Sequence, residues 1–364
     1  MQNLMLYYHI PFCLSKCAYC SFYSVPKADE ELKAKYTEAL IRQTAGFYDK
    51  DKHLVSSVYF GGGTPSVLGC DNLARVLNTV LQSFTLARDA EITAEVNPCT
   101  VDRQGLYLLK SAGFNRLSIG AQSFNDKTLK LLNRAHSAED FVKCYETARD
   151  AGFTNISADL IFGLPNETAE DLTYSLERLI GLAPEHISVY NLSIEENTPL
   201  FFKKDSYIFP NEDEEEKQYE LLCGVLAKAG YKHYEISNFA KAGYEAQHNS
   251  GYWEGVPYFG FGAGAHSFYQ NRRFDTKRDI TAFINSAYGT ALAPTRFDEA
   301  VELTEEELEE ERIMLGLRLS KGVKIKSPVP KYLIDTGLAT YSNGTLALTE
   351  KGFRVSNAII GMFI

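Results

Sequence analysis

The sequence lacks any uninterrupted apolar run near the roughly 20 residues that a membrane-spanning helix needs. Its first residues contain no basic segment followed by an apolar run, so we expect no signal peptide. Acidic residues outnumber basic ones by 47 to 37, and the formal net charge of −10 argues against a dedicated nucleic-acid-binding protein. Internal repeats and low-complexity segments are also absent. We therefore expect a soluble, globular, cytoplasmic protein.

A fourth cysteine is missing from the one dense cysteine motif. Cys13, Cys17 and Cys20 follow a C-x₃-C-x₂-C spacing. Thiolates crowded onto a short loop suit iron–sulfur or zinc coordination. A cluster of four irons held by three thiolates leaves one iron open to an external ligand, and open metal sites usually serve chemistry. The other four cysteines have no motif spacing and are expected to be buried and reduced: Cys70, Cys99, Cys144 and Cys223.

The alternative for this motif is a structural zinc site with His9 as the fourth ligand. The residues around the cysteines are largely aromatic and apolar, which favours a redox cluster because such a cluster needs shelter from solvent. These flanking residues are Phe12, Tyr19, Phe22 and Tyr23.

Short apolar segments alternate with longer segments of helical periodicity. Strands are predicted at 4–9, 57–60, 92–96, 116–120, 155–161 and 186–192, and helices at 30–48, 70–84, 100–112, 126–132, 138–151 and 168–181. This alternation predicts an α/β fold with right-handed βαβ units and a parallel sheet, arranged as a barrel that does not fully close. Chemistry in such folds lies at the carboxyl ends of the strands.

The composition changes twice along the chain, which predicts three segments. Residues 1–235 form the barrel. Residues 236–295 form a connecting segment rich in glycine, aromatics and histidine, and 296–364 form a smaller, mostly helical, winged-helix-like domain. In the last segment, helices are predicted at about 303–319 and 327–336, followed by a β-hairpin of 338–341 and 345–348 with an Asn-Gly turn.

Polar residues follow several of the predicted strands. The glycine run 61–63 offers backbone N–H groups that can hold a carboxylate or phosphate, although a tight turn without a ligand is the simpler explanation for glycines alone. Glu95 either holds an ammonium or hydroxyl group of a ligand or pairs with Arg116 on the next strand. Gln122, Arg134 and Asp159 lie near later strand ends. Together these residues predict one polar ring around a ligand.

The motif His248-Asn249-x-x-Tyr252-Trp253 contains the only tryptophan of the chain. A histidine beside flat aromatic rings is suited to ligate a haem iron. The simpler explanation is a histidine packed in an aromatic core. His266 is a weaker candidate of the same kind.

The sequence resembles the radical S-adenosylmethionine (SAM) proteins over nearly its whole length. The segments that carry the resemblance are 9–20, 61–65, Gln122, 159–165 (Asp-Leu-Ile-Phe-Gly-Leu-Pro) and 234–238 (Tyr-Glu-Ile-Ser-Asn). More narrowly, it resembles the HemW group, which is related to oxygen-independent coproporphyrinogen III oxidase and so to porphyrin metabolism. The resemblance implies a partial (β/α)₆ radical-SAM barrel.

The resemblance also implies the cofactors and their ligands. A [4Fe-4S] cluster would sit on Cys13, Cys17 and Cys20, with SAM on the fourth iron, and reduction would cleave SAM to a 5′-deoxyadenosyl radical. The positions that match SAM contacts are Tyr7, Tyr19, Gly62, Gly63, Thr64 and Glu95. The positions that match contacts to a second SAM in the oxidase are Gln122, Arg134 and Asp159.

One departure separates the two subfamilies. The oxidase carries a further cysteine two residues after the third, where this sequence has Phe22. Phe22 fits the HemW group, and so does the motif at His248, which is associated with haem binding there. The resemblance therefore makes His248 the leading candidate for a haem ligand.

The function that this resemblance implies is a haem chaperone. Its cargo would be haem and its partners haem-accepting proteins, including respiratory enzymes at the inner face of the membrane. An electron donor for the cluster and a weak homodimer are also expected. The alternative function is the oxidative decarboxylation of coproporphyrinogen III to protoporphyrinogen IX.

Overall fold

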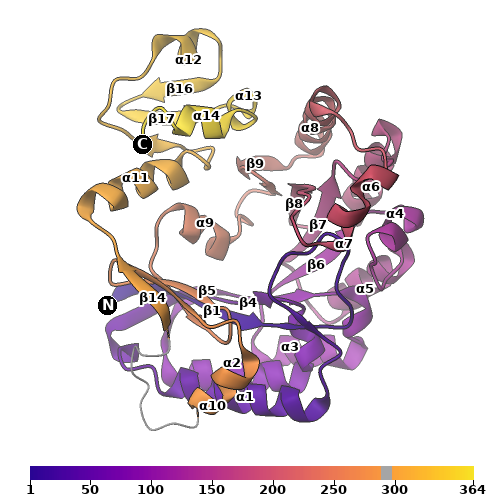
Figure 1. The fold of residues 1–364 in the computed structure, drawn as a ribbon, viewed down its shortest axis with the longest axis vertical. Coiled ribbons are helices and arrows are strands. Elements are labelled where there is room, and N and C mark those ends of the chain that lie inside the picture. The colour runs from indigo at the N-terminus through magenta and orange to yellow at the C-terminus, as the bar shows by residue number, and fades with distance from the viewer. Residues whose placement is uncertain (288–296) are drawn as a thin grey trace.

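The structure is a computed structural model that describes residues 1–287 and 297–364. Its centre is a sheet of six parallel strands, shown with their helices in Figure 1. In spatial order the strands are β1 (Gln2–Ile10), β4 (His53–Gly62), β5 (Thr85–Val96), β6 (Arg116–Gln122), β7 (Ile156–Phe162) and β8 (His186–Asn191). All six predicted strands and their parallel arrangement are confirmed.

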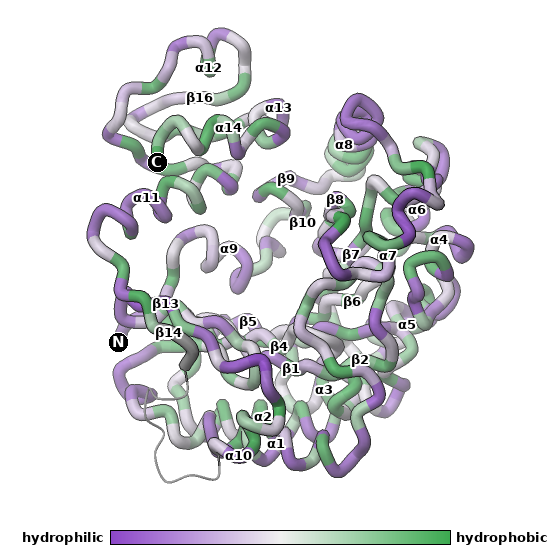
Figure 2. Tube along the Cα trace, viewed as in Figure 1, coloured by the Kyte–Doolittle hydropathy of each residue, from purple (hydrophilic) through white to green (hydrophobic). Residues whose placement is uncertain are grey.

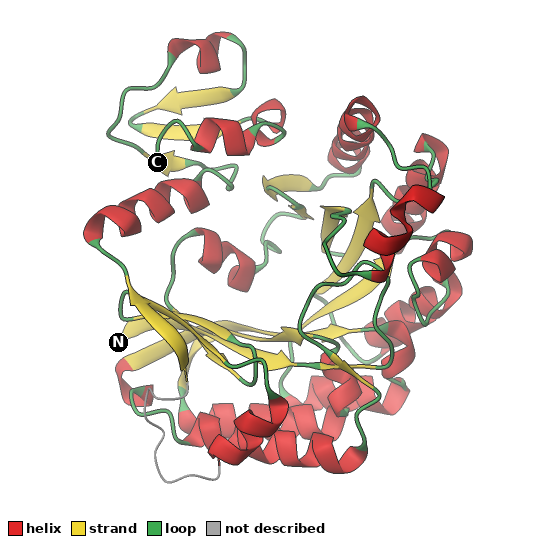
Figure 3. Ribbon diagram, in the orientation of Figure 1, coloured by secondary structure: helices red, strands yellow, loops and turns green. Residues whose placement is uncertain are grey.

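Helices cover the outer face of this sheet (Figure 3). They are α1 (Glu30–Ala45), α2 (Cys70–Ser83), α3 (Arg103–Ala112), α4 (Asp126–Leu131), α5 (Ala138–Asp150) and α6 (Ala169–Leu182). Their starts are fixed locally. Ser137 and Thr168 each form a capping box, and the Asp29 and Asp102 carboxylates accept backbone N–H bonds at the starts of α1 and α3. The helices predicted from periodicity therefore begin within about three residues of the observed ones.

The connecting segment is more ordered than the sequence indicated. Its strands, together with one strand just before residue 236 and one just after residue 295, extend both edges of the sheet. At one edge, β10 (Asn238–Ala240) pairs antiparallel with β8, followed by β9 (Lys232–Glu235). At the other edge, β11 (Tyr258–Phe261) is parallel to β1 and leads into β12 (His266–Tyr269), β13 (Arg272–Thr276) and β14 (Phe297–Glu302). The resulting twelve-stranded sheet runs from β14 to β9 without closing, as a partial barrel does.

The remaining elements of this part of the chain are short or lie at the rim. The helices are α7 (Pro199–Lys203), α8 (Glu212–Lys228), α9 (Gln247–Trp253) and α10 (Ile280–Ala287), with 3₁₀ turns η1 (Lys50–Lys52), η2 (Pro65–Leu68), η3 (Pro98–Thr100) and η4 (Lys204–Ser206). Helix α9 lies on the inner side of the sheet, opposite the layer of outer helices, and contacts β4 (Figure 1). No helix in the described ranges combines the length and apolar character needed to cross a membrane.

The C-terminal segment has a hydrophobic core of its own, and Figure 2 shows hydrophobic stretches there as well as in the barrel. It comprises α11 (Glu305–Gly316), β15 (Val323–Lys324), α12 (Lys331–Asp335), β16 (Ala339–Ser342), β17 (Thr345–Leu348), α13 (Glu350–Phe353) and α14 (Ser356–Ile360). The predicted hairpin is confirmed: Asn343 and Gly344 have φ angles of 50° and 79°, as a two-residue turn of type I′ requires. The second helix is shorter than predicted, because Pro328 and Pro330 disfavour helical backbone at the residues that precede them, Ser327 and Val329.

Backbone hydrogen bonds join this segment to the sheet edge. Ile236 N donates to the Arg318 carbonyl at 3.1 Å, and Ser320 N donates to the Tyr234 carbonyl at 2.9 Å. The predicted boundary between residues 295 and 296 lies outside the described residues, and the division into three segments remains a prediction.

A buried ion pair ties the sheet to α9. Arg116 on β6 and Glu91 on β5 are 1% and 5% exposed, and Arg116 Nε lies 3.7 Å from Glu91 Oε2. The Glu91 carboxylate also accepts the backbone N–H groups of Gln247 and His248, at 3.0 and 3.3 Å. One carboxylate thus holds the first turn of α9 against the sheet.

We expect Arg116→Met to lower the free energy of unfolding by about 3–5 kcal/mol, because it leaves a buried carboxylate without its cation. Denaturant titration of the ligand-free protein measures this. The control is Arg103→Met, since Arg103 is 65% exposed and lies 3.5 Å from Asp150, and its loss should cost less than about 1 kcal/mol. Equal effects of the two substitutions would contradict the importance of the buried pair.

Candidate functional site

A cavity of about 480 Å³ lies at the carboxyl ends of the parallel strands. It gathers eleven of the thirteen site residues predicted from the sequence: Cys13, Cys17, Tyr19, Cys20, Gly62, Gly63, Thr64, Glu95, Gln122, Arg134 and Asp159. Tyr7 and His248 are not among its lining residues. The expectation that polar residues at successive strand ends surround one space is therefore confirmed for the cavity, although their individual roles remain predictions.

The cysteine loop is anchored at its base and at its middle. Its base is a two-stranded pairing of β2 (Phe12–Cys13) with β3 (Val25–Pro26). In the middle, Ala18 N donates to the Leu132 carbonyl at 2.9 Å and Leu200 N donates to the Ala18 carbonyl at 2.8 Å. The Asn133 side chain donates to the Lys16 carbonyl at 2.8 Å. Contacts from two distant segments thus fix the loop in which the three thiols lie.

The thiols have polar neighbours but no covalent partners. Cys13 Sγ lies 3.7 Å from Thr64 Oγ1, and Cys17 Sγ accepts a hydrogen bond from Arg134 Nη1 at 3.4 Å. Burial raises the pKa of the Cys13 and Cys20 thiols. None of the cysteines in the described residues forms a disulfide. Within those residues, no group of three or more His, Cys, Asp or Glu side chains is arranged to hold a metal ion as it stands.

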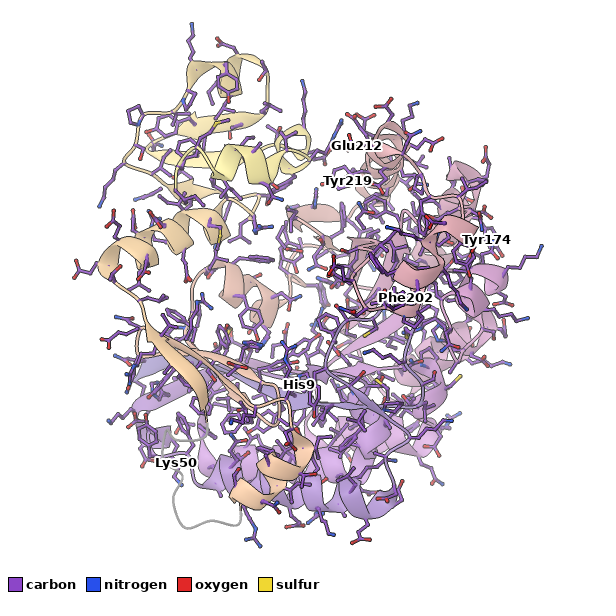
Figure 4. All side chains as sticks on the ribbon, viewed as in Figure 1. His9, Lys50, Tyr174, Phe202, Glu212 and Tyr219 are labelled. Carbon is purple, nitrogen blue, oxygen red and sulfur yellow. The ribbon has the colours of Figure 1, made fainter. Side chains whose placement is uncertain are left out.

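His9, the fourth ligand of the zinc alternative, faces away from the thiols. Its Nδ1 hydrogen-bonds the Tyr7 hydroxyl at 3.1 Å and its Nε2 lies 3.2 Å from the Tyr23 carbonyl. Burial lowers the pKa of His9 to about 4, so the ring is neutral. Both ring nitrogens are engaged, and His9, labelled in Figure 4 on β1, contributes to the packing beside the loop. The remaining donors are three soft thiols, a set that suits an iron–sulfur cluster.

The glycine run serves close packing. Gly62 has a φ of 113°, and a Cβ there would lie 2.7 Å from the His9 ring. A Cβ on Gly63 would lie 2.8 Å from the Phe12 carbonyl oxygen. The expectation that the N–H groups of this glycine run hold an anion is wrong for Gly63, whose N–H already has a partner in the protein. Gly63 N and Thr64 N donate to the carbonyls of Ile10 and Phe12, at 2.9 and 2.7 Å, and so tie the glycine run to the cysteine loop.

Glu95 is a half-buried carboxyl group at the end of β5. Its Oε1 accepts a hydrogen bond from the Tyr59 hydroxyl at 2.8 Å. Burial, together with the nearby Asp159 carboxyl, raises the pKa of Glu95 to about 7 despite that hydrogen bond. The predicted alternative of an ion pair with Arg116 is wrong, because the register sets Arg116 opposite Thr93, and its partner is Glu91. Glu95 is therefore free of a protein cation within the described residues and suits a cationic ligand.

Asp159 and Arg134 are held by different kinds of partner. Asp159 accepts hydrogen bonds from the Ser118 hydroxyl at 3.1 and 3.2 Å, and burial raises its pKa. Arg134 donates to Cys17 Sγ and, at 3.5 Å, to the Gly120 carbonyl. Gln122 ends β6 with a φ of 66°, a backbone conformation that a non-glycine residue adopts only at some cost. The cavity thus has two half-buried carboxyl groups, those of Glu95 and Asp159, and a guanidinium beside the thiols.

The histidine of the tryptophan motif lies behind the cavity wall. His248 is 1% exposed, with Nδ1 2.8 Å from the Ser57 hydroxyl and Nε2 2.9 Å from the Tyr252 hydroxyl. Burial lowers the pKa of His248 to about 3. The next residue, Asn249, does line the cavity. His248 can meet an iron only if one of these hydrogen bonds opens, whereas His266 on β12 is exposed.

Sequence reasoning missed several residues of the cavity wall. Tyr59, Ser118, Tyr190 and Asn249 all line it, and Arg116 reaches it from below. Tyr59 lies between two buried residues of a predicted strand, and an aromatic residue at such a position is usually interpreted as part of the hydrophobic core. Asn249 carried a usable signal, since it belongs to the same motif as His248.

The open α/β barrel with a three-cysteine loop over its carboxyl-end cavity defines the class. The family described as the radical SAM superfamily matches residues 7–179, from β1 into α6. Radical SAM proteins carry a [4Fe-4S] cluster and SAM. The three thiols suit the cluster, and the polar wall of the cavity suits SAM.

Curated relatives narrow this class. The protein named heme chaperone HemW of Bacillus subtilis is 35% identical, with 98% of each chain aligned. The HemW of Lactococcus lactis is 32% identical over 98% of this chain and 96% of its own. This chain therefore belongs to the HemW family. Among solved structures, coproporphyrinogen III oxidase (HemN) of Escherichia coli matches all of this chain and 90% of its own with a TM-score of 0.83. Its 23% identity supports a shared fold alone.

We expect anaerobic reconstitution to give about four irons and four sulfides per chain, and Cys17→Ala to lose most of this iron. His9→Gln should keep its iron content, because His9 faces Tyr7 and Tyr23. Metal and sulfide analysis of the purified proteins measures both. Zinc at one equivalent, lost in His9→Gln, would instead support the structural zinc site.

Proposed function

We propose that this chain is a haem chaperone that binds haem and delivers it to haem-dependent proteins. The observation that carries the proposal is its membership of the HemW family, with both chains aligned almost completely. Phe22 adds to it, because the related oxidase carries a further cysteine at this position. Phe22 is 68% exposed and lines the cavity next to Cys20, so this wall is apolar where the oxidase has a thiol.

We further propose that Cys13, Cys17 and Cys20 hold the cluster and that Glu95 accepts a hydrogen bond from the SAM amino group. The bound cofactors would supply one-electron chemistry at the open iron. Tyr19, Gly62, Gly63 and Thr64 would contact SAM from the loop side, since they line the cavity beside the thiols. Gln122, Arg134 and Asp159 would contact either the same molecule or a second one. Tyr7 would act indirectly, through the rings next to Glu95.

We expect SAM affinity to rise about five- to tenfold between pH 6 and pH 7.5. The Glu95 pKa of about 7 lies above the usual value, so the group is mostly neutral at pH 6 and mostly an anion at pH 7.5. The anion is the better acceptor for the SAM amino group and attracts the positive charge of SAM. Equilibrium binding to the reconstituted protein measures this. Glu95→Gln should bind SAM weakly with little pH dependence. A wild-type affinity that is flat over this range would contradict the role of Glu95.

The proposed haem ligand is His248, with Tyr252 and Trp253 beside it on α9. We expect His248→Ala to weaken haem binding at least tenfold and to change the Soret band, because the iron loses a nitrogen ligand. His266→Ala is the control, since His266 is exposed on β12 and belongs to no such motif. Unchanged haem affinity and spectrum in His248→Ala would refute this assignment.

The test of the function is transfer. Haem-loaded protein is mixed with an apo-haem protein, and haem movement is followed by the Soret band of the recipient. Transfer that is faster than from free haem or from haem-loaded albumin supports the proposal. The alternative is tested with the reduced, reconstituted protein, SAM and coproporphyrinogen III. Formation of protoporphyrinogen IX at catalytic turnover would overturn the chaperone as the main function.

A further inference from the structure

A cluster of three rings lies directly behind the Glu95 carboxyl group. Tyr59 stacks on His248 with ring centroids 4.9 Å apart and an interplanar angle of 24°. The Tyr7 ring stacks on the Tyr59 ring, with centroids 6.3 Å apart, and its centroid lies 6.4 Å from that of the His248 ring. These rings come from β1, β4 and α9, three elements that the sequence separates widely.

The geometry of Tyr59 is what connects this ring cluster to the cavity. Its hydroxyl donates to Glu95 Oε1 at 2.8 Å, while its ring face lies on His248. Gly61 leaves room for this contact, since a Cβ there would lie 2.8 Å from Tyr59 Cε1 and 3.0 Å from Glu95 Oε1. The direction of the Glu95 carboxyl group therefore depends on where the Tyr59 ring stands.

His248 is itself held on both sides. The Ser57 hydroxyl contacts Nδ1 and the Tyr252 hydroxyl contacts Nε2, and the Tyr252 ring meets the imidazole edge-on at 4.8 Å. A ring fixed at two nitrogens cannot rotate without breaking a buried hydrogen bond, which costs about 1–3 kcal/mol. The His248 ring thus fixes the position of the Tyr59 ring, and the Tyr59 hydroxyl in turn fixes the direction of the Glu95 carboxyl group.

We propose that His248 is a positioning residue for the SAM site, which acts through Tyr59 to orient the Glu95 carboxyl group. This rests on the proposed function in one respect, the assignment of Glu95 to the SAM amino group. It adds to that function a second role for the histidine of the tryptophan motif. The role is exerted in the haem-free protein and requires no contact between His248 and SAM.

The test is a double-mutant cycle on SAM affinity in the haem-free, cluster-loaded protein. Tyr59→Phe removes the donor to Glu95 and should weaken SAM binding about five- to tenfold. His248→Ala removes the support and should weaken it about three- to tenfold. The double variant should bind SAM with the same affinity as whichever single variant has the lower affinity, because both changes act through the same contact.

The control is His53→Ala. His53 is also a buried histidine bonded to a tyrosine hydroxyl, Tyr269 at 2.8 Å, but it stands at the opposite end of β4. Its replacement should lower thermal stability and leave SAM affinity unchanged. Tyr252→Phe is a milder variant, should His248→Ala fail to fold. It removes only the Nε2 partner and should weaken SAM binding about two- to fivefold.

The outcomes separate this inference from the haem assignment. Reduced SAM affinity in His248→Ala and Tyr59→Phe, without additivity, supports the positioning role whether or not haem affinity changes. Loss of haem binding with unchanged SAM affinity overturns the positioning role and leaves the haem ligand in place. Additive effects of the two substitutions, or an equal effect of His53→Ala, also overturn it.

Discussion

The buried carboxylate of Glu91 is the contact on which the site depends. It pairs with Arg116 across two strands and accepts two backbone N–H groups from the start of α9. Without an anion at this point, a buried guanidinium and the first turn of a seven-residue helix would both lack partners. A helix this short has little stability of its own, so its position is set by tertiary contacts. Glu91 therefore holds His248 in contact with Tyr59, the residue whose hydroxyl donates to Glu95.

The cavity wall carries charge that the fold itself does not neutralise. Glu95 and Asp159 are half-buried, and the loss of solvent raises the pKa of both. Among the described residues no cation forms an ion pair with either. Arg116 lies nearby but is engaged by Glu91. Such a wall is costly in the empty protein and favourable once a cationic ligand arrives, since the ligand supplies the missing charge. The proposed SAM molecule, with its ammonium and sulfonium groups, is a ligand of this kind.

Much of the barrel could be predicted from the sequence, because parallel strands buried on both faces give short apolar runs and their helices give clear periodicity. The cysteine motif could be recognised from its spacing, and Glu95 and Asp159 from their positions at the ends of predicted strands. The edge strands β9 to β14 were not, since they are only three to six residues long. Two of them, β10 and β11, join the sheet by pairing with β8 and β1, far away in sequence. Arg116 shows the limit for the site. Glu91 and Glu95 lie two residues on either side of Thr93, the residue opposite Arg116, and a sequence does not show which of the two carboxyl groups Arg116 meets.

His248 is a proposed iron ligand whose two ring nitrogens are both hydrogen-bonded in this structure. Neutral imidazole is the form that ligates a metal, and a pKa of about 3 keeps His248 neutral at any physiological pH. Yet both nitrogens are hydrogen-bonded to hydroxyl groups. A neutral ring has one in-plane lone pair, so a proposed haem iron competes for it with whichever hydroxyl, that of Ser57 or that of Tyr252, donates to it. Opening one of these bonds also removes the ring on which Tyr59 rests. If His248 serves both ligands, occupation of one site must change the free energy of the other by the same amount in each direction. A protein that carries cargo beside a cofactor could use that reciprocity to hold haem in one state of the SAM site and release it in the other.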